Sequence, residues 1–206
     1  MLTKYTPLFV IMIVASVIGF IIENVWLAFQ HGFIDNRGMA FPALIGYGMA
    51  VVAFYIILGV PSRPAFLGYK LPVEDFDHGL VFYFIATLIL VSVGEIVLGT
   101  AVERFTGIIW WDYSNLPMHL TRYTSLPTSA GFAFMIVLFM EYCFKPMFEY
   151  TASIQTPAMF TYSAVILVVL SVDFIHSANY MIKNHRVYDL WKRQINLSKD
   201  NKTIFN

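Results

Sequence analysis

Five long apolar runs constrain the fold of this chain more than any other feature. They cover residues 7–29, 41–60, 79–102, 128–148 and 157–182. The hydrocarbon core of a bilayer is about 30 Å thick, and about 20 mostly apolar residues cross it as an α-helix. Proline or glycine stands at or near the start of each run, and polar or proline-bearing segments separate the runs. We therefore predict an all-α fold, a polytopic membrane bundle of about five transmembrane helices.

The composition agrees with a membrane protein. Of the 206 residues, 58% are hydrophobic and 13% are charged. Soluble domains average about 45–50% apolar residues and about 25% charged residues. The formal net charge is zero, which argues against a nucleic-acid partner, and the single Cys143 allows no internal disulfide. The sequence lacks a Walker-type phosphate loop, so ATP hydrolysis by that device would require a separate chain. The first run is too long for a signal peptide, and we expect it to remain as a span.

Basic residues predict the orientation. A cytoplasmic C-terminus places nine of the 13 Lys and Arg residues on the inner side. Because positive charge favours the cytoplasmic side, we expect the N-terminus outside and the C-terminus inside, in the cytoplasmic membrane of the cell. Glu141 and Glu149 are then expected at the outer interface. Residues 1–182 would form the bundle and 183–206 a basic tail, either an interfacial helix over 183–195 or a solvated segment that only fixes the topology.

Six polar residues inside the runs or at their ends are candidates for a functional site. They are Glu23, Glu95, Glu103, Asp173, His176 and Asn179. A charge in the hydrocarbon costs at least about 2.5–3.5 kcal/mol on insertion scales, so such residues are functional candidates by default. With the N-terminus outside, the first, third and fifth runs all end at the inner leaflet. We therefore predict that these groups face one polar cavity near that leaflet.

Each candidate also has a structural interpretation. Glu23 and Glu103 lie near helix ends and could simply reach the interface. Glu95 lies deep in the third run, where a carboxylate needs a partner, and Arg37 or His176 is expected to supply it. Asp173 and His176 have the spacing of carboxylate–histidine ligands in bundles. A hydrogen bond between helices explains that pair better, and we assign no metal site.

Two predicted inner loops contain further candidates. The first reads Asn36-Arg37-Gly38, followed by Pro42, Gly46, Tyr47 and Gly48. This pattern predicts an irregular helix start, which is tolerated at membrane depth only where protein buries it or a wet cavity adjoins it. Arg37 could clamp a carboxylate or an anionic head group, or it could only mark the inner side.

The second inner loop reads Trp110-Trp111-Asp112-Tyr113-Ser114-Asn115-Leu116-Pro117. Tryptophan and tyrosine are enriched at membrane interfaces. Asp112 and Ser114 add hydrogen-bonding groups beside Trp111, and we include all three as site candidates. The alternative is that Asp112 and Ser114 only cap the next turn.

These motifs resemble those of a known family. Glu95-x7-Glu103, Gly107, the Trp110–Ser114 block and Pro117 are similar to the signature of the family labelled putative ABC-transporter type IV, or CmpB-like. Further matches are Glu23, the Asn36-Arg37-Gly38 loop with Tyr47-Gly48, and Asp173. The resemblance covers most of residues 15–180. The family name implies a permease that works with a separate ATPase.

Three functions fit these observations. The first is a small transport or permease-like subunit with a polar cavity near the inner leaflet. The second is an intramembrane enzyme that acts on a lipid or isoprenoid substrate by acid–base chemistry, with Glu95 or Glu103 as the acid or base. The third is a structural subunit of a membrane complex. We expect the lipid bilayer, partner membrane subunits or an ATPase, and an oligomer, and we assign no catalytic residue, substrate or cofactor.

Overall fold

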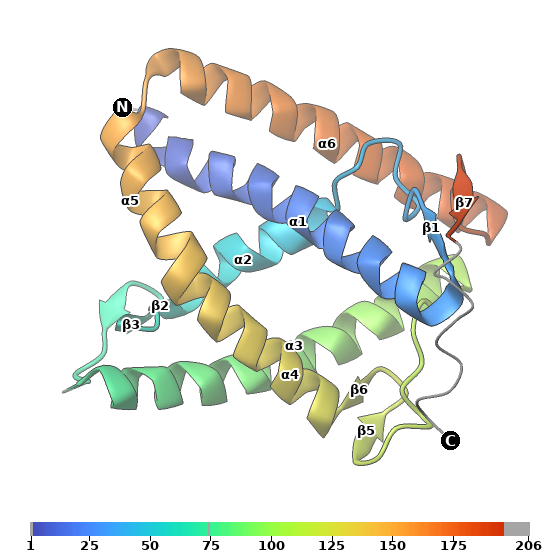
Figure 1. Ribbon diagram of the computed structural model, residues 1–206, viewed down its shortest axis with the longest axis horizontal. Helices are drawn as coiled ribbons and strands as arrows, with labels where there is room; N and C mark the ends of the chain where they lie inside the picture. Colours follow the sequence, from blue (N-terminus) through green and yellow to red (C-terminus); the bar gives the residue numbers. More distant parts are fainter. Residues whose placement is uncertain (1, 74, 196–206) are drawn as a thin grey trace.

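The protein is a bundle of long apolar helices, as predicted. The computed structural model describes residues 2–73 and 75–195 (Figure 1). In these residues four helical segments are long and apolar enough to cross a membrane. They are α1 (Thr6–His31, preceded by the short helix η1, Leu2–Tyr5), α3 (Phe76–Thr106), the continuous α4–η2–α5 (Leu126–Phe139, Met140–Phe144 and Lys145–Ile154) and α6 (Pro157–Asn184). The predicted fold class is confirmed.

The predicted span over residues 41–60 is shorter than expected. Helix α2 covers Ile45–Leu58, only 14 residues, which gives about 21 Å at 1.5 Å per residue. Residues 36–44 before it are not helical. The backbone N–H groups of Ala40 and Phe41 are bound by the side chain of Asp173, so the helix begins only after this segment.

The helices alternate in direction, so the connections gather at two ends of the bundle (Figure 1). We call one the loop end; it contains residues 32–44, 107–125 and 185–195. The other, the hairpin end, contains η1, the β2–β4 segment and the turn between α5 and α6. The short strands are β1 (Phe33–Asp35), β2 (Gly59–Val60), β3 (Arg63–Phe66), β4 (Tyr69–Lys70), β5 (His119–Thr121), β6 (Thr124–Ser125) and β7 (Lys192–Gln194).

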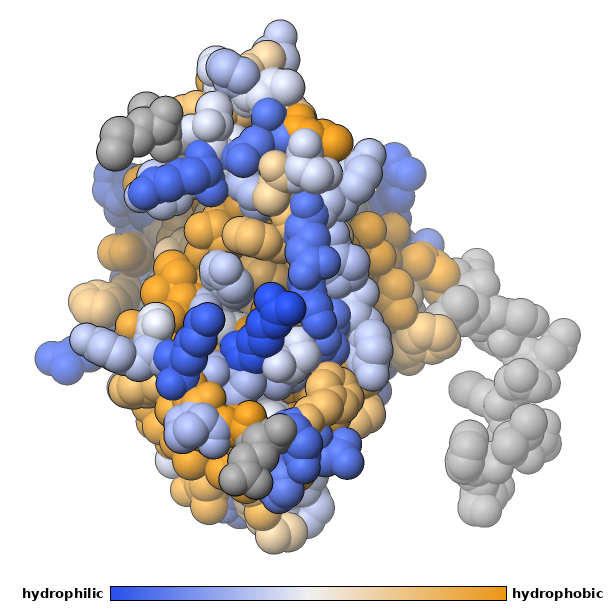
Figure 2. Space-filling model, turned by 90° about the vertical axis from the view of Figure 1, so that its left-hand side faces the viewer, coloured by the Kyte–Doolittle hydropathy of each residue, from blue (hydrophilic) through white to orange (hydrophobic). Residues whose placement is uncertain are grey.

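Close packing holds the helices together. One buried apolar cluster contains Ile11 of α1, Leu58 of α2, Tyr83 of α3 and Phe144 of η2. At Gly48 of α2 any side chain would collide with the backbone of α1, so a glycine is required for the two helices to approach this closely. The outward faces of the helices remain apolar and exposed, which suits contact with lipid. Figure 2, viewed onto the hairpin end, shows hydrophilic side chains over that end and hydrophobic ones along its flanks.

A buried ion pair anchors the hairpin end. Glu141 of η2 accepts a hydrogen bond from the ammonium of Lys145 at 2.8 Å and another from the backbone N–H of Ser62 at 2.9 Å. Glu141 is buried, and its partners compensate the loss of solvent; its position at the outer interface stays a prediction. Glu149 is exposed.

The tail folds back onto the loop end. Helix α6 ends at Asn184, and His185 after it adopts a left-handed conformation with φ of 52°. Strand β7 then pairs antiparallel with β1. The interfacial helix considered for residues 183–195 is therefore wrong beyond Asn184, since the tail backbone bonds to β1 instead of to itself. Residues 196–206 lie outside the described part of the chain.

Candidate functional site at the loop end

The segment 36–44 enters the bundle without forming a helix, and we call it the re-entrant segment. Its last N–H, that of Leu44, donates to the carbonyl of Ser16 in α1 at 2.9 Å. The N–H groups of Ala40 and Phe41 donate to the carboxylate of Asp173 at 3.0–3.1 Å. Asp173 stands 11 residues before the end of α6, about 17 Å along its axis. Irregular backbone therefore packs against α6 well inside the helix, and we expect it to lie at bilayer depth.

Asp173 holds the re-entrant segment and does not form a ligand pair with His176. Asp173 is 7% exposed, whereas His176 and Asn179 are exposed. Residues three positions apart are offset by about 60° around an α-helix, and Asp173 and His176 line one groove beside α6. The polar stripe that includes Asn179 stays a prediction. Among the residues described, no group of three or more His, Cys, Asp or Glu side chains could hold a metal ion.

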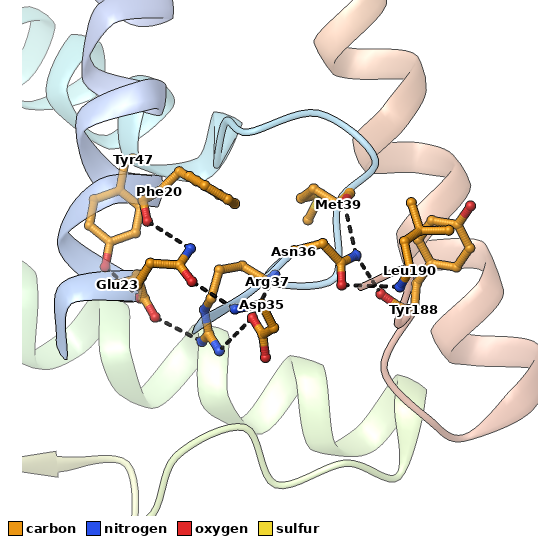
Figure 3. Close-up of polar contacts among 10 residues, drawn as sticks. Phe20, Glu23, Asp35, Asn36, Arg37, Met39, Tyr47, Tyr188 and Leu190 are labelled. Carbon is orange, nitrogen blue, oxygen red and sulfur yellow. Dashed lines mark hydrogen bonds and ion pairs between the residues drawn. The ribbon is translucent and has the colours of Figure 1, made fainter. Parts of the chain in front are cut away.

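Arg37 organises a first polar cluster, the Arg37 cluster, which also contains Glu23, Asp35 and Tyr47 (Figure 3). The guanidinium Nη2 donates to Oε2 of Glu23 at 2.8 Å, and the hydroxyl of Tyr47 donates to Oε1 at 2.7 Å. The Nη1 atom lies 3.7 Å from Oδ1 of Asp35. Arg37 itself has a φ of 50°, a left-handed conformation that is uncommon for residues other than glycine. The cluster joins α1, α2 and the re-entrant segment.

Glu95 forms a second cluster with partners that were not expected. Its Oε2 atom accepts hydrogen bonds from the hydroxyls of Thr124 and Ser129, both at 2.8 Å. Both hydroxyl residues are fully buried. Within residues 2–73 and 75–195 no Lys, Arg or His forms an ion pair with Glu95. The expected partners Arg37 and His176 were therefore wrong, because Arg37 is already engaged by Glu23.

Glu103 lies closer to solvent. Its carboxylate accepts a hydrogen bond from Nη1 of Arg122 at 3.1 Å and one from the hydroxyl of Tyr123. The side chains of the Arg122–Glu103 pair are 42% and 38% exposed. This position agrees with the interpretation that Glu103 reaches the interface.

The Trp110–Ser114 block folds against the start of α4. The indole Nε1 of Trp111 donates to the carbonyl of Tyr123 at 2.9 Å. Asp112 accepts the backbone N–H of Ser114 at 2.8 Å in a local turn, and the hydrogen bonds from Ser114 lower the pKa of Asp112. Asp112 and Ser114 therefore form the local capping contact that was the alternative to a role in a functional site.

Tyr113 is a half-buried tyrosine of the loop end, and sequence reasoning missed it as a site residue. Burial raises the pKa of Tyr113 to about 12, with further contributions from the negative charges of Glu95 and Glu23. Its hydroxyl therefore lies within electrostatic reach of both carboxylates. Its place inside the Trp110–Ser114 block was the available signal, whereas nothing in the sequence marked Thr124 and Ser129 as partners of Glu95.

Asn36 ties the re-entrant segment to the tail (Figure 3). Its side-chain amide donates to the carbonyls of Met39 at 2.9 Å and Tyr188 at 2.8 Å, and its oxygen accepts the N–H of Leu190 at 3.1 Å. Asn36 is 3% exposed. Both N–H donors of its side chain and one of the two lone pairs of its oxygen are thus used within the protein.

A small polar cavity adjoins these residues at the loop end. It has a volume of about 150 Å³ and is lined by Asp35, Asn36, Arg37, Trp110, Val187, Asp189 and Lys192. Of the predicted site residues, only Asn36 and Arg37 line it. The structure thus brings Glu23, Arg37 and Tyr47 together and places Glu95 and Glu103 in separate clusters. A shared cavity for all candidates stays a prediction.

In the described residues, four long apolar helices and a shorter fifth define a polytopic helical membrane protein. A family model described as putative ABC-transporter type IV matches residues 10–178. The chain therefore belongs to that family. No curated protein and no solved structure gave a significant match. The family and the apolar helices fit a transport-related membrane subunit.

Proposed function

We propose that this chain is a small permease-like subunit that binds its solute at the loop end, between the Arg37 cluster and Glu95. The re-entrant segment is the observation that carries the proposal. Non-helical backbone at membrane depth is found where protein buries it or a water-filled path adjoins it, and discontinuous helices of this kind form the binding sites of many transporters. The contacts of the segment with Ser16 and Asp173 support its depth.

Glu95 is the group that we propose interacts with the solute. Its two hydrogen-bond donors are neutral hydroxyls, and no ion pair compensates its charge in the part of the chain described above. A carboxylate in this state can accept a proton or pair with a cationic group. The charges of Glu95 and Glu23 both contribute to the raised pKa of Tyr113, and we propose that Tyr113 lines the same path. We therefore favour a solute that carries positive charge, or transport coupled to a proton.

Other subunits would complete the path. Hydrolysis of ATP by a Walker-type site would come from a separate ATPase, and we propose that the chain works as an oligomer or with partner membrane subunits. Seven Lys and Arg residues lie in the loop end or in the last turns of α3 and α6 beside it, against four at the hairpin end, so we place the loop end on the cytoplasmic side of the cell membrane.

The test compares cells that lack the chain with cells complemented by the wild type, Glu95→Gln or the matched control Glu149→Gln on exposed α5. Untargeted mass spectrometry then measures solutes in the cells and in the medium, and lipids in the membrane. In cells that lack the chain, we expect the distribution of at least one solute between the cells and the medium to change. The wild type and Glu149→Gln should restore this distribution, and Glu95→Gln should not.

Other outcomes contradict transport. Accumulation of a lipid or isoprenoid precursor in the Glu95→Gln cells would favour the intramembrane enzyme. Loss of folded Glu95→Gln protein in detergent, with no change in any solute for a stable Thr124→Val variant, would favour a structural subunit.

A further inference from the structure

An apolar groove runs along the outer side of α6 at the loop end. It has a volume of about 440 Å³, and its wall includes Phe41 of the re-entrant segment together with Val168, Val169 and Val172 of α6. Ala40, Asp173, His176 and Tyr188 line the groove as well. The valines are exposed in this chain, so the groove opens toward the surrounding bilayer. It is separate from the Arg37 cluster and from Glu95.

The groove lies at the depth of the hydrocarbon. Val172 stands 12 residues before the end of α6, which is about 18 Å along the helix axis. His176 lies one turn nearer the loop end. The groove therefore has an apolar floor deep in the bilayer and a polar margin toward the interface.

Aromatic and cationic side chains continue from that margin toward the loop end. The ring of Tyr188 packs edge-on against His176, with centroids 5.2 Å apart, and against Tyr180 at 5.0 Å. Arg186 donates from Nε to the hydroxyl of Tyr180 at 2.9 Å and lies over its ring. Lys183 follows His176 by seven residues and so lies on nearly the same face of α6, about 10 Å nearer its end.

We propose that this groove binds one acyl chain of a phospholipid whose anionic head group pairs with Arg186 and Lys183. The valine walls suit a hydrocarbon chain, and tyrosines are typical of the interface. Cations at the head-group level attract anionic lipids. Asp173, whose oxygens are bound by backbone N–H groups, lies 10 residues before Lys183 on α6, about 15 Å along the axis, so its charge is distant from the head-group site. Asp189 instead lines the separate polar cavity with Lys192.

The binding test uses the full chain in detergent micelles. Native mass spectrometry measures retention of dioleoyl phosphatidylglycerol and dioleoyl phosphatidylcholine, which have the same acyl chains, offered together. We expect retention of the anionic lipid to exceed that of the zwitterionic lipid about fivefold, the factor that one cation near an anionic surface contributes.

Matched variants separate the chain from the head group. Val172→Trp fills the groove and should abolish retention of phosphatidylglycerol. Val97→Trp on α3 is its control, because Val172 and Val97 are similarly exposed, at 61% and 63%. The double variant Lys183→Gln/Arg186→Gln should remove the preference for phosphatidylglycerol but leave phosphatidylcholine retention unchanged, with Arg104→Gln as control. Val168→Trp repeats the first test if Val172→Trp does not fold.

Three outcomes would overturn the proposal. The first is equal retention of the two lipids by the wild type. The second is phosphatidylglycerol binding that survives both groove-filling variants. The third is displacement of the lipid by inorganic phosphate at an equal concentration, because that result would make the acyl chain irrelevant.

Discussion

Asp173 accepts the backbone N–H of Ala40 through both of its carboxylate oxygens, at 3.0 and 3.1 Å, across 133 positions of the chain. This contact, with the one to Phe41, holds a non-helical segment against the last transmembrane helix. Asp173 therefore does for the re-entrant segment what an N-cap does for a helix, since it satisfies backbone donors that would otherwise be buried without partners.

Replacing Asp173 by Ala should destabilise the fold, and the effect should be largest at the loop end. Each lost hydrogen bond to a charged group costs about 1.5–3 kcal/mol, and the N–H groups left behind remain buried. We expect a clear fall in the free energy of unfolding, measured by denaturation in mixed micelles. Asn179→Ala on the exposed side of α6 is the control and should change little. A wild-type stability for Asp173→Ala would contradict the assigned contact.

The two arginine–glutamate pairs should differ in coupling energy. The side chains of Arg37 and Glu23 are 15% and 28% exposed, so a double-mutant cycle to Gln should give about 0.5–3 kcal/mol. The more exposed pair of Arg122 and Glu103 should give only about 0.2–1 kcal/mol, and salt should weaken it further. Thermal denaturation of the four variants of each cycle measures both energies. A larger coupling for the exposed pair would show that burial does not govern these contacts.

Tyr113 should make the fold sensitive to alkaline pH. Its pKa is raised from 10.0 to about 12, so the folded protein keeps a proton that the unfolded chain releases. The stability that this group contributes is complete below pH 10.0 and is lost as the pH rises through about 12. Tyr113→Phe should therefore lose less stability than the wild type over this window. Tyrosinate absorbance, compared between the two proteins, should assign a late-titrating group to Tyr113, and a difference that titrates near pH 10.0 instead would contradict its burial.

Asn36→Ala should release the tail from the loop end. The substitution removes three hydrogen bonds, two of them to residues of the tail, and each is worth about 1 kcal/mol. Hydrogen exchange should accelerate at Leu190 and along β1 and β7. Asn184→Ala is a suitable control, because Asn184 is exposed and bonds only within its own helix. Unchanged exchange at Leu190 would show that the strand pairing alone holds the tail.

Periodicity and length predicted the helices well, because a run of apolar residues has few alternatives in a bilayer. The exception is instructive. Residues 41–44 are apolar and were included in a predicted span, although Gly38 and Pro42 indicated an irregular start. Their backbone is engaged by Asp173 and Ser16, and no local pattern identifies partners so far away.

The candidate site was predicted less completely. Glu23, Arg37 and Tyr47 were singled out and do meet, because each is conspicuous against an apolar or glycine-rich background. The predicted partners of Glu95 were wrong. The sequence shows which charged residues are present, but it does not show which carboxylate Arg37 contacts. Thr124 and Ser129 could not be predicted, because hydroxyl residues are common near helix starts, where they usually cap the backbone.

The contact between Asp173 and the re-entrant segment also sets an order of assembly. Ribosomes add about 5–20 residues per second, so about 7 to 27 seconds separate the synthesis of Ala40 from that of Asp173. Throughout this interval the first loop has no acceptor for its buried N–H groups. The N-terminal half of the bundle therefore matures last, when α6 has been inserted and the tail has closed over Asn36. A chain shortened before α6 would insert its first helices but leave this loop incomplete.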